Sequence, residues 1–207
     1  MAKAKKKSGA KRGGVKKSSA ELDFATAFKY PFNRWKGMLN ILWVLLPIFG
    51  WFALGGYGVR IVKEFSQGKF KQLPLFSFVS DMKLGAFMFV KALPFMIAYV
   101  IVSSILDHVP VLGSAASLVL ELFVVPILSI NFMIKQSIES YFEFDILKSV
   151  TENLGEYFMT LLKSIGLFLV FAVMILVIVG LPAMAFTTNI FFADFYRRRI
   201  MKKKEDG

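Results

Sequence analysis

The sequence contains no cysteine and a single histidine, His108, among its 207 residues. The absence of cysteine excludes disulfide bonds, a thiolate nucleophile and any metal site that depends on sulfur. A lone histidine cannot supply a histidine cluster for a metal ion. The chain also has no serine–histidine–acid arrangement, no phosphate-binding glycine loop and no HExxH motif. We therefore expect no metal ion, no cofactor and no enzymatic activity.

Acidic residues are few as well: 14 Asp and Glu stand against 26 Lys and Arg, which gives a formal net charge of +12. Yet 56% of the residues are hydrophobic and the mean hydropathy is +0.59, more apolar than a typical soluble domain. These facts are compatible because the charges are segregated: eight basic residues fall within residues 1–20 and six within residues 197–207. The pattern predicts a multi-pass protein of the plasma membrane with both termini in the cytoplasm.

Charge is absent from one long stretch, since thirty consecutive uncharged residues separate Lys163 from Asp194. As a helix, thirty residues reach about 45 Å, whereas the hydrocarbon core of a bilayer is about 30 Å thick. The stretch is too long for one crossing and short for two. Within it, Gly180-Leu181-Pro182 combines a residue suited to ending a helix with one suited to starting the next. We predict a hairpin near residues 160–199, with either a full turn or only a kink at this tripeptide.

The first apolar run, residues 37–57, is interrupted by Pro47 and Gly50 and has basic residues on both sides. A short hairpin near residues 33–67 keeps both flanks on one side of the membrane. A re-entrant path and a single kinked helix stay open as alternatives for this run. The small residues of Gly55-Gly56-Tyr57-Gly58 are expected to allow close packing of helices.

Residues 84–106 and 109–134 are each long enough to span a membrane, which predicts a hairpin near residues 84–135. The loop between them carries Asp107 and His108 but no lysine or arginine, so we place it outside the cell. A proline lies within each arm, at positions 94 and 126. Each should kink its helix and free a backbone carbonyl that a neighbouring group must satisfy.

Together these patterns predict an all-α, polytopic integral membrane protein with three helical hairpins and about four to six membrane helices. Residues 1–20 have no acidic and no aromatic residue and are predicted to be disordered. Residues 21–199 form the membrane domain, with a surface segment at 64–83 and an amphipathic cytoplasmic helix near 140–160. Residues 200–207 form a second basic tail.

Short motifs in these elements carry a family resemblance. They are Ala27-Phe28-Lys29-Tyr30-Pro31-Phe32, Pro47-Ile48-Phe49-Gly50, Gly56-Tyr57-Gly58-Val59-Arg60, the segment 68–75, Phe144-Asp145-Ile146, Asn153-Leu154-Gly155-Glu156-Tyr157 and the segment 180–198. Beyond Leu22 the chain resembles a prokaryotic membrane family known only as domain of unknown function 4013, from which it departs chiefly in its long lysine-rich tail. The resemblance implies a polytopic helical protein and supplies no activity, substrate or site.

Charged side chains inside the predicted spans are the candidate functional residues, because a charge in the bilayer costs about 3 kcal/mol or more. Lys91 and Glu121 are expected in the second hairpin. They either form an ion pair, or Lys91 reaches the headgroups while Glu121 is protonated. Alternatively, Glu121 binds a proton or a cation, and Pro126 and Asn131 shape a polar path. Lys91, Glu121 and Asn131 thus form a candidate intramembrane polar site.

The basic residues at both ends are expected to contact anionic lipid headgroups, in particular Lys5, Lys6, Lys7, Arg197, Arg198 and Arg199. Asp194 precedes the first two of these arginines by three and four residues, a spacing that favours local ion pairs. Binding of nucleic acid by the lysine-rich tail is the sharper alternative. We do not favour it, because basic tails commonly act by electrostatic attraction alone.

Two functions remain open. The chain is expected to be a non-enzymatic membrane module that acts through lipid and partner helices, supplied by a second copy or by other membrane proteins. The alternative is a small transporter or channel subunit that uses Glu121 and Lys91. A polar, water-accessible cavity that reaches Glu121 would favour transport, and a dry helical bundle would favour the module. A membrane enzyme acting on lipid lacks any catalytic constellation.

Overall fold

The structure, a computed structural model, describes residues 21–109 and 111–202, and every regular element within them is a helix. This confirms the all-α prediction. Three of the helices are long and apolar enough to cross a membrane: Phe78–Asp107, Leu112–Lys135 and Leu154–Val177. The tail predicted at residues 1–20 and most of the tail predicted at 200–207 lie outside the described residues.

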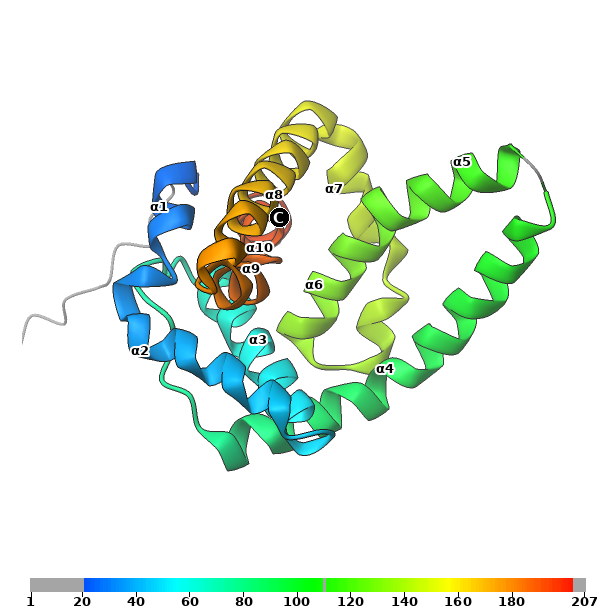
Figure 1. Cartoon of the computed structure of the whole chain (residues 1–207). Coiled ribbons are helices and arrows are strands. Elements are labelled where there is room, and N and C mark those ends of the chain that lie inside the picture. The colour runs from blue at the N-terminus through cyan, green and yellow to red at the C-terminus, as the bar shows by residue number, and fades with distance from the viewer. Residues whose placement is uncertain (1–20, 110, 203–207) are drawn as a thin grey trace, which may run out of the picture.

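Hairpin 1 occupies the first apolar run. Helix α1 (Phe24–Lys29) precedes the hairpin and is capped by Asp23, whose carboxylate accepts hydrogen bonds from backbone N–H groups of the first turn. The outgoing arm is α2 (Trp35–Met38) continued by the 3-10 helix η2 (Leu39–Leu45), and the return arm is α3 (Phe49–Ser66). The chain reverses at residues 46–48, so this run is a hairpin and not a single kinked helix (Figure 1).

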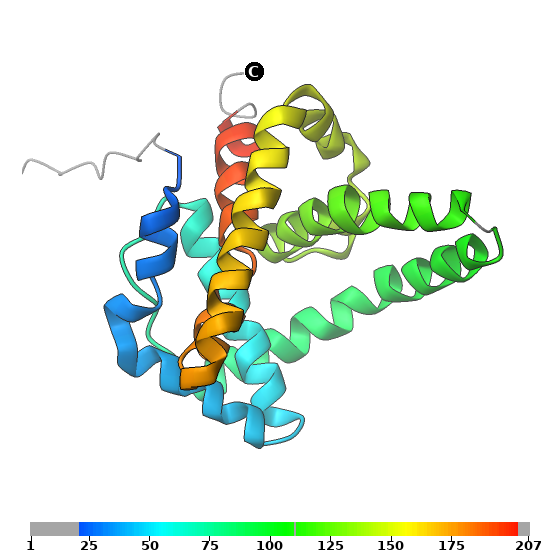
Figure 2. The same cartoon turned by 45° about the horizontal axis from the view of Figure 1, so that its top comes forward.

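Hairpin 2 projects from the rest of the molecule in both views (Figures 1 and 2). It consists of α4 (Phe78–Asp107), α5 (Leu112–Val119), a π-helical turn at Leu120–Val124 and α6 (Val125–Lys135). Helix α4 begins six residues before the start expected from the sequence. The reason is local: the Asp81 carboxylate accepts the Ser77 backbone N–H at 2.8 Å and so satisfies a free donor at the helix start. The surface segment expected at 64–83 is therefore only the loop 67–77.

Hairpin 3 reverses fully. Helix α8 (Leu154–Met174) and a 3-10 turn (Ile175–Val177) lead outward, and α9 (Gly180–Thr187), α10 (Ile190–Tyr196) and a π-helical turn (Arg197–Met201) lead back. Figure 2 shows the returning arm (orange to red) beside α8, ending near the end from which α8 starts. The reversal lies at residues 178–179, ahead of the Gly180-Leu181-Pro182 tripeptide, which forms the first turn of α9.

The amphipathic segment expected near 140–160 is not one helix. It forms two short 3-10 turns (Ile138–Tyr141 and Phe144–Ile146) and α7 (Leu147–Glu152) before α8 starts. Asn153 separates the two α-helices with a non-helical backbone (φ −128°, ψ 39°), and its side-chain amide donates to the Ser149 carbonyl at 2.9 Å. Asparagine competes in this way with the helical hydrogen bonds of its own backbone.

The three hairpins reverse with one geometry. In each turn a β-branched residue takes a positive φ of about 65°, and a glycine follows two residues later; these pairs are Ile48 and Gly50, Val111 and Gly113, Ile178 and Gly180. A Cβ on each glycine would lie well inside 3.0 Å of a backbone oxygen of the opposite arm, namely that of Trp43, Leu106 and Phe171. Glycine is thus required where the two arms approach each other most closely.

Helices α3 and α4 pack closely through Gly56 and Gly85, as the glycine-rich motif led us to expect. A Cβ at either position would overlap a backbone oxygen of the other helix. One turn further along α3, the Arg60 guanidinium lies 2.6 Å from the carboxylate of the fully buried Asp81. The rest of the core surrounds α10, in which every residue from Ile190 to Tyr196 is buried.

Candidate functional site

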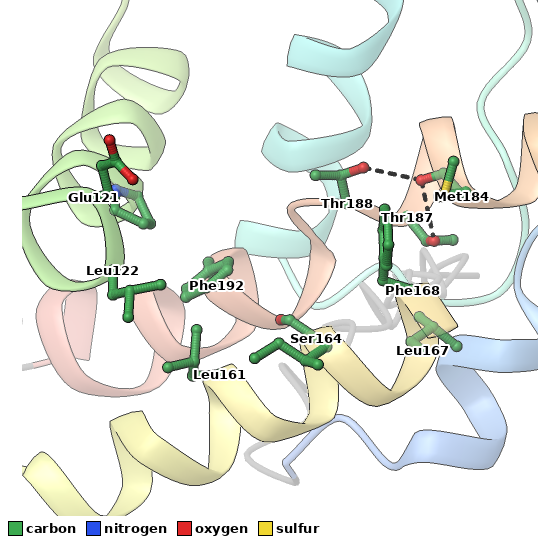
Figure 3. Close-up of a pocket in the computed structure, with 12 residues that line it drawn as sticks. Glu121, Leu122, Leu161, Ser164, Leu167, Phe168, Met184, Thr187, Thr188 and Phe192 are labelled. Atoms are coloured by element: carbon green, nitrogen blue, oxygen red, sulfur yellow. Dashed lines mark hydrogen bonds between the residues drawn. The ribbon is translucent and has the colours of Figure 1, made fainter. Parts of the chain in front are cut away.

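A cavity of about 330 Å³ lies between hairpins 2 and 3 and reaches Glu121; we call it the Glu121 pocket. The π-helical turn and α6 form one wall, and α8, α9 and α10 form the other (Figure 3). Eight of its twelve lining residues are apolar; the polar ones are Glu121, Ser164, Thr187 and Thr188. The pocket is therefore a mainly apolar space with a carboxylate at one end.

The π-helical turn that carries Glu121 lies next to Pro126. Proline has no N–H to donate to the carbonyl four residues earlier, which here belongs to Leu122. The Tyr157 hydroxyl donates to that carbonyl at 2.6 Å and replaces the missing bond across the helix interface. The neighbour expected to satisfy the freed carbonyl is thus a tyrosine of α8. Glu121 itself is exposed, and its Oε1 accepts a hydrogen bond from the Tyr99 hydroxyl at 3.1 Å.

Lys91 does not pair with Glu121. Its ammonium donates to the Gln136 carbonyl at 2.6 Å and lies 4.2 Å from the centroid of the Phe87 ring. Gln136 ends α6 in a left-handed conformation, so the lysine contacts the negative end of that helix, a favourable place for a cation. The structure therefore separates the two charges for which the sequence left an ion pair open.

Asn131 lies apart from the pocket. It is buried, its amide donates to the Ser140 carbonyl at 2.6 Å, and its Oδ1 accepts from the Tyr196 hydroxyl. It ties α6 to the following loop and to α10 and does not line the Glu121 pocket. Within the pocket, the hydroxyls of Thr187 and Thr188 donate to carbonyls of their own helix at 2.8 and 2.9 Å. The structure thus brings none of the three candidate site residues together.

Seven charged residues gather in one cluster, the charged cluster, where the two described ends of the chain meet α8. Its members are Glu21, Glu156, Lys163, Asp194, Arg197, Arg198 and Arg199. The Asp194 carboxylate accepts the Leu22 backbone N–H at 2.9 Å and pairs with Arg197 at 2.6 Å and with Arg198 at 2.9 Å. The local pairing expected from the spacing of these residues is therefore confirmed.

Other contacts in the charged cluster join separate segments. Glu156 pairs with Arg198 and Arg199, and Lys163 pairs with Glu21. The hydrogen bond from Lys163 holds the pKa of Glu21 below its usual value, whereas burial raises the pKa of Asp194 against the opposing effect of its donors.

These pairs bear on the expected headgroup contacts. Arg197 is buried and Arg198 is largely enclosed, whereas the Arg199 side chain is 45% exposed. Lys5, Lys6 and Lys7 lie outside the described residues. Headgroup contact by these six residues stays a prediction, with Arg199 the most accessible of the three arginines. Among residues 21–109 and 111–202, no group of three or more His, Asp or Glu is arranged to hold a metal ion.

Sequence reasoning missed two polar centres. Asp81 stood among alternating charges and aromatics that indicated a surface segment, yet it is fully buried and holds Arg60. Glu156 lies within the amphipathic helix expected near 140–160, yet it joins α8 to two arginines of the returning arm. The signal for Asp81 was the helix start itself, because an acidic residue in the first turn is stabilised by the positive end of a helix.

Comparison with known proteins identifies the family. The family model described as "Protein of unknown function (DUF4013)" matches residues 39–180. The chain belongs to this family. The match covers most of hairpin 1, all of hairpin 2 and the outgoing arm of hairpin 3, and it confirms the resemblance noted in the sequence. No curated protein and no solved structure matches the chain. With three helices that are long and apolar enough to span a bilayer, this DUF4013 protein is a membrane protein.

Proposed function

We propose that this DUF4013 protein is a non-enzymatic, multi-pass module of the plasma membrane, with both termini in the cytoplasm, that acts through lipid and partner helices. The observation that carries this proposal is the chemistry of the Glu121 pocket. The pocket is mainly apolar, and its two threonine hydroxyls are used by their own helix. A path for ions or polar solutes needs polar groups or water along its length.

The outer half of hairpin 2 supports the same proposal. Its α4 presents large apolar side chains that are more than half exposed, including Ile97, Ile101 and Ile105. A helix that is apolar on all sides needs lipid or other helices around it. We expect both, with a second copy of this chain or another membrane protein as the protein partner. Anionic headgroups are the expected partners of the basic termini.

A cysteine scan tests for partner helices. The native chain has no cysteine, so Ile101→Cys on α4 can be crosslinked in intact membranes with a short bifunctional reagent. We expect a discrete crosslinked species, from a second copy or another membrane protein, that Lys69→Cys, an exposed loop residue, does not give. A monomer as the sole product at both positions would argue against helix partners.

A transporter or channel subunit is the second candidate, because an exposed carboxylate, Glu121, stands at the end of a cavity. Flux of protons and monovalent cations into proteoliposomes separates the candidates. For the module we expect the same leak from wild type, Glu121→Gln and empty liposomes. A flux that wild type supports and Glu121→Gln abolishes would overturn the module in favour of transport, and a loss with Lys91→Gln as well would assign both charges to the path.

A further inference from the structure

The turns of hairpins 1 and 3 are entirely apolar. We call residues 45–49 and 176–181 the apolar tips; each residue in them is either a large apolar residue, proline or glycine. Leu45 is 78% and Leu176 is 88% exposed, and Ile48 and Ile178 are also largely exposed. Turns that face water usually contain Asn, Asp or Ser, which these tips lack. Their composition is that of a surface covered by lipid.

The backbone of the apolar tips is hydrogen-bonded within the turn. In hairpin 1, the N–H groups of Leu46, Phe49 and Gly50 donate to carbonyls of the same turn at 2.7–3.0 Å. The Trp51 indole N–H donates to the Val44 carbonyl at 3.0 Å. In hairpin 3, the N–H groups of residues 178 and 179 donate to carbonyls two or three residues back at 2.7–2.8 Å. Such internal bonding is what a chain reversal needs in hydrocarbon, where water cannot satisfy the backbone.

The arms of both hairpins are short. In hairpin 1, the 3-10 and α-helical arm Trp35–Leu45 reaches about 20 Å, and α3 reaches about 17 Å between Phe49 and Arg60. In hairpin 3, residues 164–177 and 180–193 each reach about 20 Å from the charged cluster. All four lengths fall short of the hydrocarbon core, which is about 30 Å thick, although the whole helix Leu154–Val177, counted from before the charged cluster, is long enough to cross it. By contrast, α4 has 30 residues, and its tip carries the exposed polar residues Asp107 and His108.

Helix α3, the return arm of hairpin 1, ends beside the charged cluster, from which both arms of hairpin 3 extend. The Arg197 guanidinium of the charged cluster lies 5.2 Å from the centroid of the Phe70 ring, just after α3. Figure 2 shows both turns at the opposite end, away from the start of α8. Residues of η2 and of the hairpin 3 turn line one cavity of about 400 Å³, and all twelve of its lining residues are apolar. Helix α3 and both arms of hairpin 3 therefore extend in one direction from the charged cluster, and the outgoing arm of hairpin 1, from Trp35 to Leu45, lies against the turn of hairpin 3.

We infer that hairpins 1 and 3 form a re-entrant wedge: both enter the bilayer from the side of the charged cluster, and their apolar tips end among lipid acyl chains without reaching the far headgroups. The occupant of the exposed tip surface is thus the interior of the lipid bilayer. Hairpin 2, with its longer arms and polar tip, is the part that reaches water on the other side. The wedge adds area mainly to the leaflet of the charged cluster.

Cysteine accessibility tests the wedge. Leu45→Cys and Leu176→Cys place a thiol on each tip, Lys69→Cys marks the base, and His108→Cys marks the tip of hairpin 2. A membrane-impermeant maleimide is applied to sealed vesicles of each orientation. We expect Lys69→Cys to react from one side, His108→Cys from the other, and the two tip thiols from neither side until detergent is added. Reaction of a tip from the His108 side would show a crossing hairpin, and reaction from the Lys69 side would show a tip in water; either would overturn the wedge.

A charge scan gives an independent readout. Leu45→Lys or Leu176→Lys places an ammonium group in hydrocarbon, whereas Leu75→Lys changes a residue that is 74% exposed in the loop 67–77. We expect the tip variants to lower the yield of membrane-inserted, monodisperse protein roughly tenfold or more, and Leu75→Lys to leave it unchanged. Equal yields for all three would overturn the wedge. Neither readout depends on flux or on partner helices, so the wedge and the proposed function can fail separately.

Discussion

Gly56→Ala should separate α3 from α4 and destabilise the protein. A Cβ at position 56 would lie well inside 3.0 Å of the Asp81 carbonyl oxygen, and Gly85 meets the Phe52 carbonyl in the same way. Both obstacles are helix backbone, which cannot rotate aside as a side chain can. The helices must therefore move apart by roughly 1 Å, and the close-packed contacts beside the glycines are lost.

The expected loss of stability in Gly56→Ala has two parts. Overpacking a tight interface costs about 1–3 kcal/mol. In addition, Arg60 follows Gly56 by one helical turn and pairs with the fully buried Asp81, so moving the helices apart also weakens that ion pair. A buried carboxylate that loses part of its partner adds about 1 kcal/mol or more. We expect a total near 3 kcal/mol, which is about a hundredfold in the unfolding equilibrium constant.

The neighbouring glycine supplies the control. A Cβ at position 55 meets nothing within 4 Å. Gly55→Ala should therefore change stability by less than about 0.5 kcal/mol, or raise it slightly, because alanine favours the helix. The assay is the midpoint of SDS-induced unfolding of each purified variant in mixed micelles, followed by circular dichroism. Equal midpoints for Gly56→Ala and Gly55→Ala would refute the close approach of α3 and α4.

Two further outcomes are expected. Tyr157→Phe leaves the Leu122 carbonyl without a donor and should cost about 1–3 kcal/mol in the same unfolding assay, whereas Tyr99→Phe, at an exposed site, should cost less than about 0.5 kcal/mol; equal costs would contradict the role of Tyr157. The Lys163 pair lowers the pKa of Glu21, so its stabilisation is full above the unperturbed value of 4.5 and is lost as pH falls through the lowered pKa. The thermal midpoint should therefore fall more on acidification in wild type than in Glu21→Gln; parallel curves would show that the pair contributes nothing.

The hairpins could be predicted from the sequence because their signals are local. Proline or glycine interrupts each apolar run, and basic residues flank the runs at 37–57 and 163–199. The position of the third reversal could not be predicted, because glycine was expected to end the helix. In the structure Ile178 takes the positive φ, and Gly180 instead permits the returning helix to approach the Phe171 carbonyl. A glycine that allows close packing and one that allows an unusual φ look alike in a sequence.

The partners of the candidate site residues could not be predicted for a different reason. Lys91 contacts a backbone carbonyl at the end of α6, and Glu121 contacts a tyrosine of α4. Backbone acceptors exist at every position, so a sequence does not show which of them is left unpaired. The burial of Asp81 could not be predicted for a similar reason. Its burial depends on two glycines that bring α3 and α4 together, at positions 56 and 85.

A β-branched residue at positive φ, as at Ile48, is strained by about 1–3 kcal/mol, and glycine or asparagine would relieve that strain. Asparagine has no such advantage in hydrocarbon, where an amide without a partner costs about 2–7 kcal/mol. In hydrocarbon, the cost of an unpaired amide outweighs the strain, so isoleucine is favoured over asparagine at this position. This comparison gives a test. Ile48→Gly should leave the SDS midpoint nearly unchanged, because relieved strain offsets the lost apolar contact, whereas Ile48→Asn should lower stability by about 2 kcal/mol or more. If the SDS midpoint of Ile48→Asn equals or exceeds that of Ile48→Gly, the turn faces water, and the strain at Ile48 needs another explanation.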